Sequence, residues 1–453
     1  MIEFHPVDFI YSKVRPAEEI RPHFSYKKEF WKPGKYSKTP TSYDSFLIKK
    51  NGSFLSGFLP KFEKWCTGQG KEFSSYDIRD HLPPYFPILP GPSLPGITFR
   101  EDQLRLIESA RKHLRGVLKS PTGSGKTVIA SGIISMFPKA KVLFLCHTIS
   151  LIKQTITEFS RFGLGPISQV GSGSKDISGR IVVATMQSFS KIPIEETCDK
   201  FDIVIVDESH HVNSFSSTYA KILTSLLVPI RFGFTATLPT TTEGKMALEG
   251  LIGPLLDEVS IQEGMDLEFL AKPKVQLMAV PKYTSLREEG IFSYKAIYDA
   301  TIVSYRKRNS IVMNAVKELN SKGKSAIIYV TQIDHGERLV DIGDRMGVSS
   351  FFVRGSVGAE EREQLRKDLQ NKKVMCVIAT TVWKEGVNVL SVGAIVIAGG
   401  GKSELILLQS IGRGFRRDTG KDEIIIVDFI DIGRYISDHF CERLSVYVEN
   451  GWI

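Results

Sequence analysis

The stretch from Pro121 to Thr127 has the residue types and spacing of a loop that binds phosphate groups. Gly123 and Gly125 allow the backbone to curl closely around phosphates and to aim successive N–H groups at them. Lys126 would supply a positive charge to the β- and γ-phosphates, and the hydroxyl of Thr127 would bind Mg²⁺. The residues predicted to hold the nucleotide in this stretch are Thr122, Gly123, Ser124, Gly125, Lys126 and Thr127.

Two adjacent acids, Asp207 and Glu208, follow about 80 residues further along the chain. Asp207 is predicted to hold Mg²⁺ through water, because Mg²⁺ gives up its water ligands reluctantly. Glu208 is predicted to orient and deprotonate an attacking water molecule. A phosphate loop combined with such an acid pair predicts hydrolysis of a nucleotide.

Each of these groups needs an element that positions it. Apolar runs precede both: Arg115 to Lys119 before the loop, and Ile203 to Val206 before the acids. Both runs are predicted strands, and open parallel sheets bind ligands at the carboxyl ends of their strands. A helix from Lys126 to about Phe137 would add its N-terminal dipole to the phosphate site.

Short apolar runs alternate with amphipathic segments through most of the chain, which is typical of parallel sheets covered by helices. The predicted strands are 141–146, 180–185, 201–207, 230–235, 275–280, 325–330, 349–353, 374–379, 392–398 and 424–428. Only the first four of these strands, 141–146 to 230–235, are accompanied by a phosphate loop, and the six from 275–280 onward have no such loop of their own. We therefore predict an α/β protein with two tandem domains of similar type and a nucleotide bound between them. The predicted domain boundaries are 1–95, 96–265 and 266–453.

Residues 1–95 differ in composition and are predicted to form a small α+β accessory domain, separated by the proline-rich segment 82–96. Residues 21–50 contain eight basic, two acidic and seven aromatic residues. Two interpretations stay open: the aromatic side chains form the core of a small domain, or this segment binds nucleic acid. The lysines predicted to contact nucleic acid are Lys27, Lys28, Lys32 and Lys35.

The overall composition narrows the possible classes of protein. The net charge of +9 and the pI of about 9.1 favour a polyanionic partner. The five cysteines form no CxxC pair, which argues against structural zinc and against a disulfide framework. No apolar run approaches 18 residues and no signal-peptide pattern begins the chain, so we expect a soluble protein in a reducing compartment, the cytoplasm.

Further motifs follow one another along the chain: Phe99 to Gln103, Phe144 to Thr148 with Gln154, Val183 to Ser188, Thr235 to Thr237, Ala379 to Thr381 with Glu385 to Asn388, and Gln409 to Arg416. Together with the loop and the acid pair, this order resembles a superfamily 2 helicase or translocase of the DExH type, over roughly residues 99–431. The resemblance implies two RecA-like domains, ATP as the nucleotide and a nucleic acid as the partner. The host cytoplasm is implied if the chain is encoded by a phage.

The resemblance also implies roles for individual residues. Arg100 and Gln103 would read the adenine, and His210 with Thr235 and Thr237 would couple the acid pair to the nucleic-acid groove. In the second domain, Gly386 and Asn388 would contact the nucleotide, although the family often has Asp where Asn388 stands. The implied nucleic-acid contacts are Thr148, Gln154, Thr185, Gln187, Thr380 and Thr381.

The segment from Gln409 to Arg416 has a spacing that places three side chains on or near one face of a helix. These are Gln409, Arg413 and Arg416. By the resemblance, Arg413 and Arg416 would reach the γ-phosphate as arginine fingers, a role that can accelerate hydrolysis about 10³-fold or more.

Within this superfamily the chain most resembles UvsW-type phage recombination helicases and their XPB-like relatives. The features that carry this narrower resemblance are the small N-terminal domain, Asp207 to His210, Arg161 to Gly163, and Leu270 to Pro273. It implies action on branched DNA, in recombination, repair or replication: fork regression, Holliday-junction migration and D-loop unwinding. An RNA helicase is the alternative enzyme, and a non-motor structural protein that binds nucleic acid is the second alternative.

Overall fold

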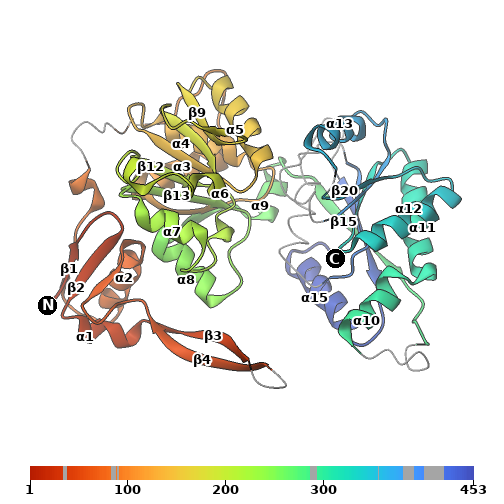
Figure 1. Ribbon diagram of the computed structural model, residues 1–453, viewed down its shortest axis with the longest axis horizontal. Helices are drawn as coiled ribbons and strands as arrows, with labels where there is room; N and C mark the ends of the chain where they lie inside the picture. Colours follow the sequence, from red (N-terminus) through yellow and green to blue (C-terminus); the bar gives the residue numbers. More distant parts are fainter. Residues whose placement is uncertain are drawn as a thin grey trace. The chain divides into compact units, whose positions relative to one another are not determined.

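The computed structural model describes residues 1–33, 38–82, 88, 91–285, 293–355, 357–380, 392–401 and 423–453 (Figure 1). The chain divides into two compact units. The first contains Met1–Ser120 and Gly125–Val259, and the second contains Ser260–Ile453 together with Pro121–Ser124.

The larger sheet of the first unit has eight strands in the order β10-β9-β11-β8-β12-β13-β7-β14. All neighbours pair in parallel except β10 and β9. The strands are β7 (Arg115–Lys119), β8 (Val142–Cys146), β9 (Ile167–Gly171), β10 (Ser174–Lys175), β11 (Ile181–Thr185), β12 (Ile203–Val206), β13 (Ile230–Thr235) and β14 (Leu255–Glu258).

Helices cover both faces of this sheet, so its central strands are apolar on both sides (Figure 1). In β12, Val204 and Val206 pack with the helices α6, α7 and α8. On the opposite face, Phe144 of β8 meets Phe159 of α5 edge-on, with ring centroids 5.2 Å apart. The helices are α3 (Glu101–His113), α4 (Lys126–Ser135), α5 (Ile149–Arg161), α6 (Met186–Phe189), α7 (Thr218–Ser225) and α8 (Thr242–Leu251).

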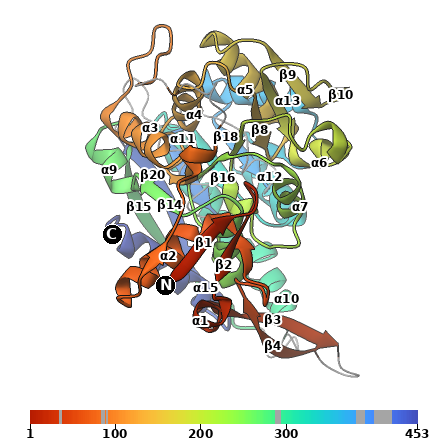
Figure 2. The ribbon, with the colours of Figure 1, turned by 90° about the vertical axis from the view of Figure 1, so that its left-hand side faces the viewer.

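The first 80 residues form a second, smaller sheet in the same unit, with the strand order β5-β2-β1-β6 (Figure 2). Buried phenylalanines build its core: the ring of Phe62 lies 4.9 Å from that of Phe54 and 4.5 Å from that of Phe24. Many of the N-terminal aromatic residues are therefore core residues. The elements are β1 (Ile2–Pro6), β2 (Tyr11–Arg15), α1 (Ala17–Ile20), β5 (Ser53–Leu55), α2 (Leu59–Gly68) and β6 (Phe73–Ser74).

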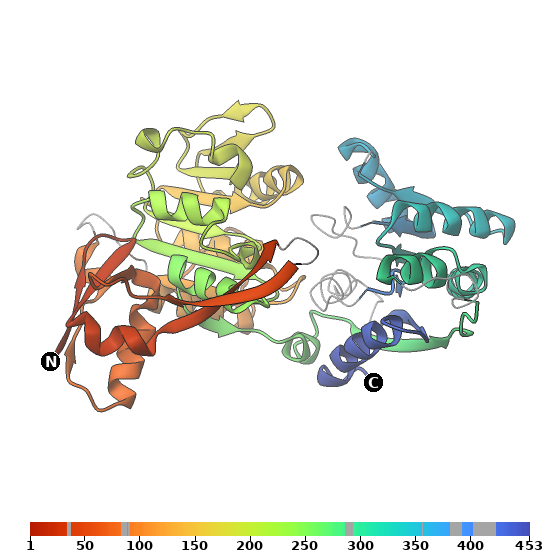
Figure 3. The same cartoon turned by 60° about the horizontal axis from the view of Figure 1, so that its bottom comes forward.

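Two long strands, β3 (Ser25–Pro33) and β4 (Lys38–Phe46), pair only with each other and form an antiparallel ribbon. Figure 3 shows this ribbon, in red, running beside green helices of the first unit. Its base is held there by an ion pair of 2.9 Å between Lys28 and Glu243 of α8. The N-terminal elements are thus packed on α8 rather than separate from it, and a second ion pair, Lys61 with Glu249 at 2.8 Å, reinforces this contact.

The second unit has a six-stranded, fully parallel sheet in the order β15-β20-β19-β16-β18-β17. Helices α13 and α15 pack on one face of it, and α11 and α12 pack on the other. The strands are β15 (Lys272–Ala279), β16 (Ala326–Tyr329), β17 (Phe351–Val353), β18 (Cys376–Ala379), β19 (Ala394–Ile397) and β20 (Glu423–Ile430). The helices are α9 (Ile261–Asp266), α10 (Tyr294–Tyr298), the π-helical turn η6 (Asp299–Val303), α11 (Arg306–Ser321), α12 (Ile333–Arg345), α13 (Ala359–Gln370) and α15 (Ile436–Glu449).

The predicted fold class is confirmed: each unit contains a parallel sheet between helices, and each apolar run named above overlaps a strand. The sequence patterns did not indicate β9, the edge strands β10 and β14, or the π-helical turn η6. These three strands are short and partly exposed, so their hydrophobic signal is weak. Within the described part of the chain, no helix has both the length and the apolar character that crossing a bilayer requires.

Candidate nucleotide-binding and hydrolysis site

The phosphate loop follows β7 directly and runs into α4, as the motif requires. Gly123 has φ 98° and Gly125 has φ 87°, a region that favours glycine. A Cβ atom on Gly125 would lie 2.8 Å from Nε2 of Gln103, so a side chain at this position would displace the Gln103 amide. The ammonium group of Lys126 lies 3.4 Å from the carbonyl oxygen of Ser120.

The acid pair follows β12 at the same edge of the sheet. Glu208 has a left-handed backbone with φ 48° and ψ 50°, a strained conformation for glutamate that is common at functional sites. Its N–H donates to Oδ1 of Asp207 at 3.0 Å. Burial, reinforced by the negative charge of Glu208, raises the pKa of Asp207 to about 7, although Lys126 opposes the shift. A carboxylate in this setting is stabilised by an added cation.

His210 links the acid pair to the neighbouring strand β13. Its Nδ1 lies 3.1 Å from Oγ1 of Thr235 and 3.4 Å from Oε2 of Glu208. The Thr235 hydroxyl donates its proton to the carbonyl of Thr237 at 2.6 Å, so it must accept from His210. The hydrogen-bond pattern therefore assigns the Nδ1–H form to His210, with that proton directed at the Thr235 hydroxyl, while Oε2 of Glu208 lies close by and makes no hydrogen bond in the described structure.

A second histidine contact joins β12 to the strand on its other side, and the sequence did not indicate it. The ring of His211 stacks on that of His147, which follows β8, with centroids 3.7 Å apart and planes 7° apart. The N–H of Asp207 also donates to the carbonyl of Leu145 in β8, at 2.9 Å. Finding this contact from the sequence would require knowing that β8 and β12 are neighbours.

The carboxyl ends of four adjacent strands are thus connected in series. The phosphate loop is tied to β13 by the Ser120 N–H, which donates to the carbonyl of Thr235 at 2.9 Å. Thr235 contacts His210, and the acid pair and His211 contact β8. Hydrogen bonds and one ring stack thus link the phosphate loop to the segment after β8.

Arg100 and Gln103 were predicted to read the adenine, and both lie at the start of α3. The Arg100 guanidinium forms two hydrogen bonds of 2.9 Å with the buried carboxylate of Asp102. The Gln103 side chain accepts from the Arg100 backbone N–H at 3.2 Å, and its Nε2 faces Gly125. Gln103 therefore lies against the phosphate loop, while Arg100 is engaged by a neighbouring acid.

The predicted nucleic-acid contacts of the first unit have different surroundings. Thr148 precedes α5, and Gln154 lies within α5, where its amide nitrogen is 3.4 Å from Oε1 of Glu158. Thr185 is only 2% exposed, and its hydroxyl caps α6 by accepting from the Ser188 N–H at 3.3 Å. Gln187 is exposed on the first turn of α6.

The remaining predicted residues fall into two groups. Lys27 is exposed on β3, Lys28 is paired with Glu243, and Thr380 is buried at the end of β18. The others lie outside the described residues: Lys35, Thr381, Gly386, Asn388, Gln409, Arg413 and Arg416, together with the side chain of Lys32.

Two family models match separate parts of the chain. A family model described as "Type III restriction enzyme, res subunit" matches residues 96–240, which include the phosphate loop and the acid pair. A second, described as "Helicase conserved C-terminal domain", matches residues 307–418.

Several curated proteins are similar over most of the chain. The "DNA 3'-5' translocase XPB2" of Sulfurisphaera tokodaii is 26% identical over 398 residues, covering 79% of this chain and 85% of that protein. The "ATP-dependent DNA helicase uvsW" of Enterobacteria phage T4 is 25% identical over 333 residues, covering 70% and 65%. A protein of the Sulfolobus islandicus filamentous virus is 26% identical over 347 residues, covering 70% and 60%. The chain therefore spans less than two thirds of the length of the two viral relatives.

Solved structures share the fold at lower identity. The helicase MrfA, solved bound to DNA, aligns with a TM-score of 0.61 at 18% identity, covering 78% of this chain and 49% of that one. Dbp5 of S. cerevisiae, solved bound to RNA, aligns with a TM-score of 0.56 at 15% identity, covering 79% and 93%. These likenesses establish the arrangement of the parallel sheets and nothing beyond the fold.

Proposed function

Because this chain belongs to the superfamily 2 helicases, with UvsW-type and XPB-like relatives, we propose that it is an ATP-driven motor that moves along DNA and remodels branched DNA. The observation that carries this proposal is the series of contacts across the carboxyl ends of β7, β13, β12 and β8. It joins the phosphate loop to the segment after β8, where the family resemblance places a contact with the nucleic-acid strand. A motor needs such a connection, because hydrolysis must change the grip on the strand.

In the proposed reaction, Lys126 binds the β- and γ-phosphates of ATP, and Glu208 accepts a proton from the attacking water. The donor set suits Mg²⁺: Asp207 and Thr127 offer only oxygen atoms, and two protein ligands leave room for water and phosphate oxygens. Bound there, Mg²⁺ would neutralise phosphate charge. His210, which is hydrogen-bonded to Thr235 and lies 3.4 Å from the Glu208 carboxylate, would couple the state of Glu208 to β13.

Residues of the second half complete the proposal. Arg413 and Arg416 act on the γ-phosphate, with Gln409 beside them, and Gly386 and Asn388 contact the nucleotide. Thr380 and Thr381, with Thr148, Gln154, Thr185 and Gln187 of the first half, contact the nucleic-acid backbone. Arg413→Ala and Arg416→Ala should each lower the DNA-stimulated kcat about 100-fold or more.

The choice of DNA is supported by two relatives, of which one is named a DNA translocase and the other a DNA helicase. The preference for branched DNA is what the resemblance to UvsW-type recombination helicases implies. The net charge of +9 suits either nucleic acid. We propose domains at 1–95, 96–265 and 266–453, with residues 1–95 as the accessory part that contacts duplex or junction DNA.

The test is the rate of ATP hydrolysis by the full chain with single-stranded, duplex, forked and four-way DNA and with single-stranded RNA. We expect DNA to raise the rate and forked or four-way DNA to raise it most. Greater stimulation by RNA would favour an RNA helicase, and equal stimulation by all DNA forms would remove the preference for branches. Lys126→Ala is the control for contaminating hydrolysis, and a wild-type rate no higher than this control would refute the motor.

A further inference from the structure

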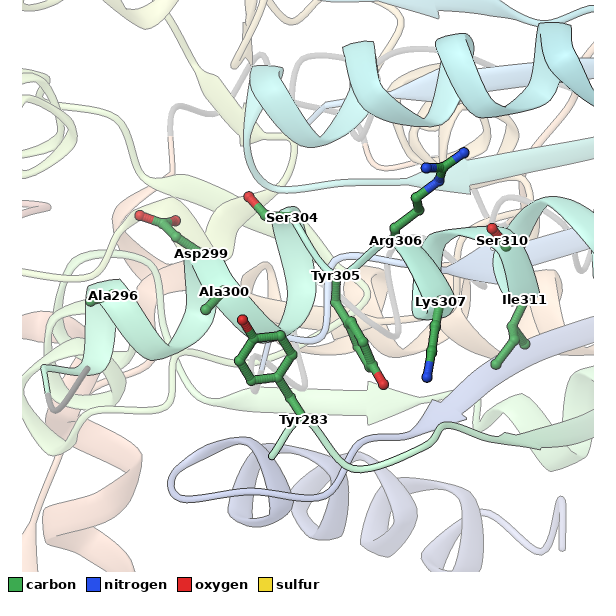
Figure 4. Close-up of a pocket in the computed structure, with 10 residues that line it drawn as sticks. All are labelled: Tyr283, Ala296, Asp299, Ala300, Ser304, Tyr305, Arg306, Lys307, Ser310 and Ile311. Atoms are coloured by element: carbon green, nitrogen blue, oxygen red, sulfur yellow. The ribbon is translucent and has the colours of Figure 1, made fainter. Parts of the chain in front are cut away.

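A hollow of about 1050 Å³ opens on the second unit beside the start of α11 (Figure 4). The residues around it that matter here are Tyr283, Asp299, Tyr305 and Lys307. None of them belongs to the motifs described above, and all lie in the described part of the chain.

Two tyrosines form one wall of the hollow. The rings of Tyr283 and Tyr305 meet edge to face, with centroids 5.2 Å apart and planes 89° apart. Both rings are only half-buried. A ring held in place by a neighbour while part of it faces solvent offers a surface on which a nucleobase can stack, whatever its sequence.

The charge beside the rings is positive. Lys307 is exposed, and its side chain extends in the same direction as that of Tyr305 (Figure 4). Among the described residues, no carboxylate lies within ion-pair distance of Lys307. The acid on the wall, Asp299, points away from the rings and accepts a hydrogen bond of 2.9 Å from Nε2 of Gln332. The hollow therefore combines an aromatic surface with a cation, which suits a base joined to a phosphate.

The hollow lies at the ligand-binding edge of the sheet. Gln332 follows β16, so its bond to Asp299 ties the hollow to the carboxyl end of that strand. The hydroxyl of Tyr298, just before Asp299, also bonds to the carbonyl of Gly399 beyond the end of β19. Open parallel sheets bind their ligands at this edge. It is also the edge where Thr380, a proposed nucleic-acid contact, follows β18.

We propose that this hollow holds one nucleotide of a single nucleic-acid strand, with its base stacked on Tyr305 and a neighbouring phosphate beside Lys307. The inference rests on the proposed function and deepens it, because it locates a part of the strand's path in the second unit. A free mononucleotide has the same chemistry, but an open hollow grips it weakly, whereas a strand adds contacts elsewhere. Among the described lining residues, Lys307 is the cation on the side of the rings, and Arg306 also lines the hollow but extends the other way (Figure 4).

The first test is affinity of the full chain for oligo(dT), measured by fluorescence anisotropy across a salt series. Tyr305→Ala should weaken binding about 5- to 100-fold, and Tyr305→Phe should restore it to within about 2-fold because the ring remains. Lys307→Ala should weaken binding and flatten the salt slope by about 0.7. Tyr294→Ala, an exposed tyrosine outside the hollow, and Lys322→Ala are the matched controls and should bind like wild type.

The second test does not depend on the folding of a variant. Oligo(dT) carrying 5-iodouracil is crosslinked to the wild-type chain by light, and the modified peptide is identified by mass spectrometry. We expect a crosslink at Tyr305 that excess unlabelled oligo(dT) removes and that dTMP at the same nucleotide concentration does not. Equal competition by dTMP would show that the hollow binds a free nucleotide, and it would contradict the proposal that the hollow holds part of a strand.

Basal and DNA-stimulated ATP hydrolysis separate this inference from the proposed function. Basal hydrolysis should be unchanged in Tyr305→Ala, while the DNA concentration needed for half-maximal stimulation should rise. If DNA stimulates the wild type but neither the affinity change nor the crosslink is found, the inference fails and the motor stands. If no nucleic acid binds or stimulates the wild type, both fail.

Discussion

The two units bury arginine side chains in opposite ways. In the first unit, Arg231 is fully buried and donates to the carbonyl oxygens of four residues, at 2.7 to 3.1 Å. In the second, Arg308 binds Asp431, and Arg443 binds Asp428, through two hydrogen bonds each. Within the described chain, no ion pair involves Arg231.

The difference concerns the acids at the carboxyl edge of each sheet. Asp428 and Asp431 lie at the end of β20 and just after it, and arginines of the same unit hold both. Asp207 and Glu208 lie at the corresponding edge of the first unit, and no arginine or lysine forms an ion pair with them in the described structure. Acids paired with an arginine stabilise the fold, whereas acids that no arginine or lysine pairs are left to bind a cation or accept a proton. The same sheet edge thus serves stability in one unit and chemistry in the other.

The largest effect that this comparison predicts comes from removing the proposed base, Glu208. Glu208→Gln should lower kcat for ATP hydrolysis about 10²- to 10⁴-fold, because an amide cannot accept the proton of the attacking water. ATP binding, measured by equilibrium titration, should persist. Glu195→Gln, on an exposed turn of the first unit, is the control, and turnover near the wild-type rate in Glu208→Gln would contradict the assigned role.

Removing a paired acid should instead damage the fold. Asp428 accepts two hydrogen bonds from Arg443 and one of 2.8 Å from the hydroxyl of Tyr447. Asp428→Ala leaves the guanidinium buried without a counter-charge, which should cost about 3–5 kcal/mol. Hydrogen exchange should locate the loss in peptides of the second unit. Glu318→Ala, which removes an exposed ion pair with Lys322, should leave exchange unchanged.

Arg231→Met should cost less than Asp428→Ala, about 2 kcal/mol, because it removes the buried charge and leaves neutral carbonyl oxygens, not a charge, without a hydrogen-bond partner. Burial already lowers the pKa of Arg231, so the charged form is held at some cost. Urea unfolding followed by hydrogen exchange of first-unit peptides measures the change. A loss as large as that in Asp428→Ala would mean that carbonyl oxygens compensate a buried guanidinium as well as a carboxylate does.

The unpartnered acid should make stability depend on pH. Asp207 has an ordinary pKa of 3.8, raised to about 7 by burial, so the folded chain binds the proton more tightly than the unfolded chain. Stability is therefore full below about pH 4 and falls as the pH rises to about 7. Asp207→Asn should be about 1–3 kcal/mol more stable than wild type at pH 8 and equal to it near pH 4. Melting temperatures across this range measure the difference, and no gain at pH 8 would contradict it.

The smallest predicted effects concern the antiparallel ribbon of β3 and β4. Lys27 is exposed, whereas the hydrogen bond that Lys28 donates to Glu243 raises the pKa of Lys28 and holds its ammonium group. If unpartnered charges are the ones that bind ligands, Lys27→Ala should flatten the salt slope of duplex-DNA binding by about 0.9, and Lys28→Ala should not. Equal slopes for the two variants would show that the ion pair opens when DNA binds.

How much of the structure could be predicted from the sequence depends on how far apart in the chain the interacting residues lie. The strands before the phosphate loop and the acid pair are local apolar patterns, and the structure has β7 and β12 there. The stack of His147 on His211 depends on which strands are neighbours, and no local pattern contains that order. Arg231 looks like a surface residue in the sequence because its partners are backbone carbonyls, which leave no pattern of side-chain types. The packing of residues 1–80 on α8 likewise depends on contacts between distant segments.

The side chain of Arg115, whose strand β7 was described above, has a consequence for how the protein folds during its synthesis. Arg115, the first residue of β7, is buried and donates to the carbonyls of Phe9 at 2.9 Å and Ile252 at 2.7 Å. The first of these partners leaves the ribosome long before Arg115, and the second long after it. Since domains tend to fold as they are synthesised, the strand that leads into the phosphate loop cannot be fully bonded until both arrive. A truncated chain that stops before residue 252, or starts after residue 9, would leave this arginine incompletely bonded inside the protein.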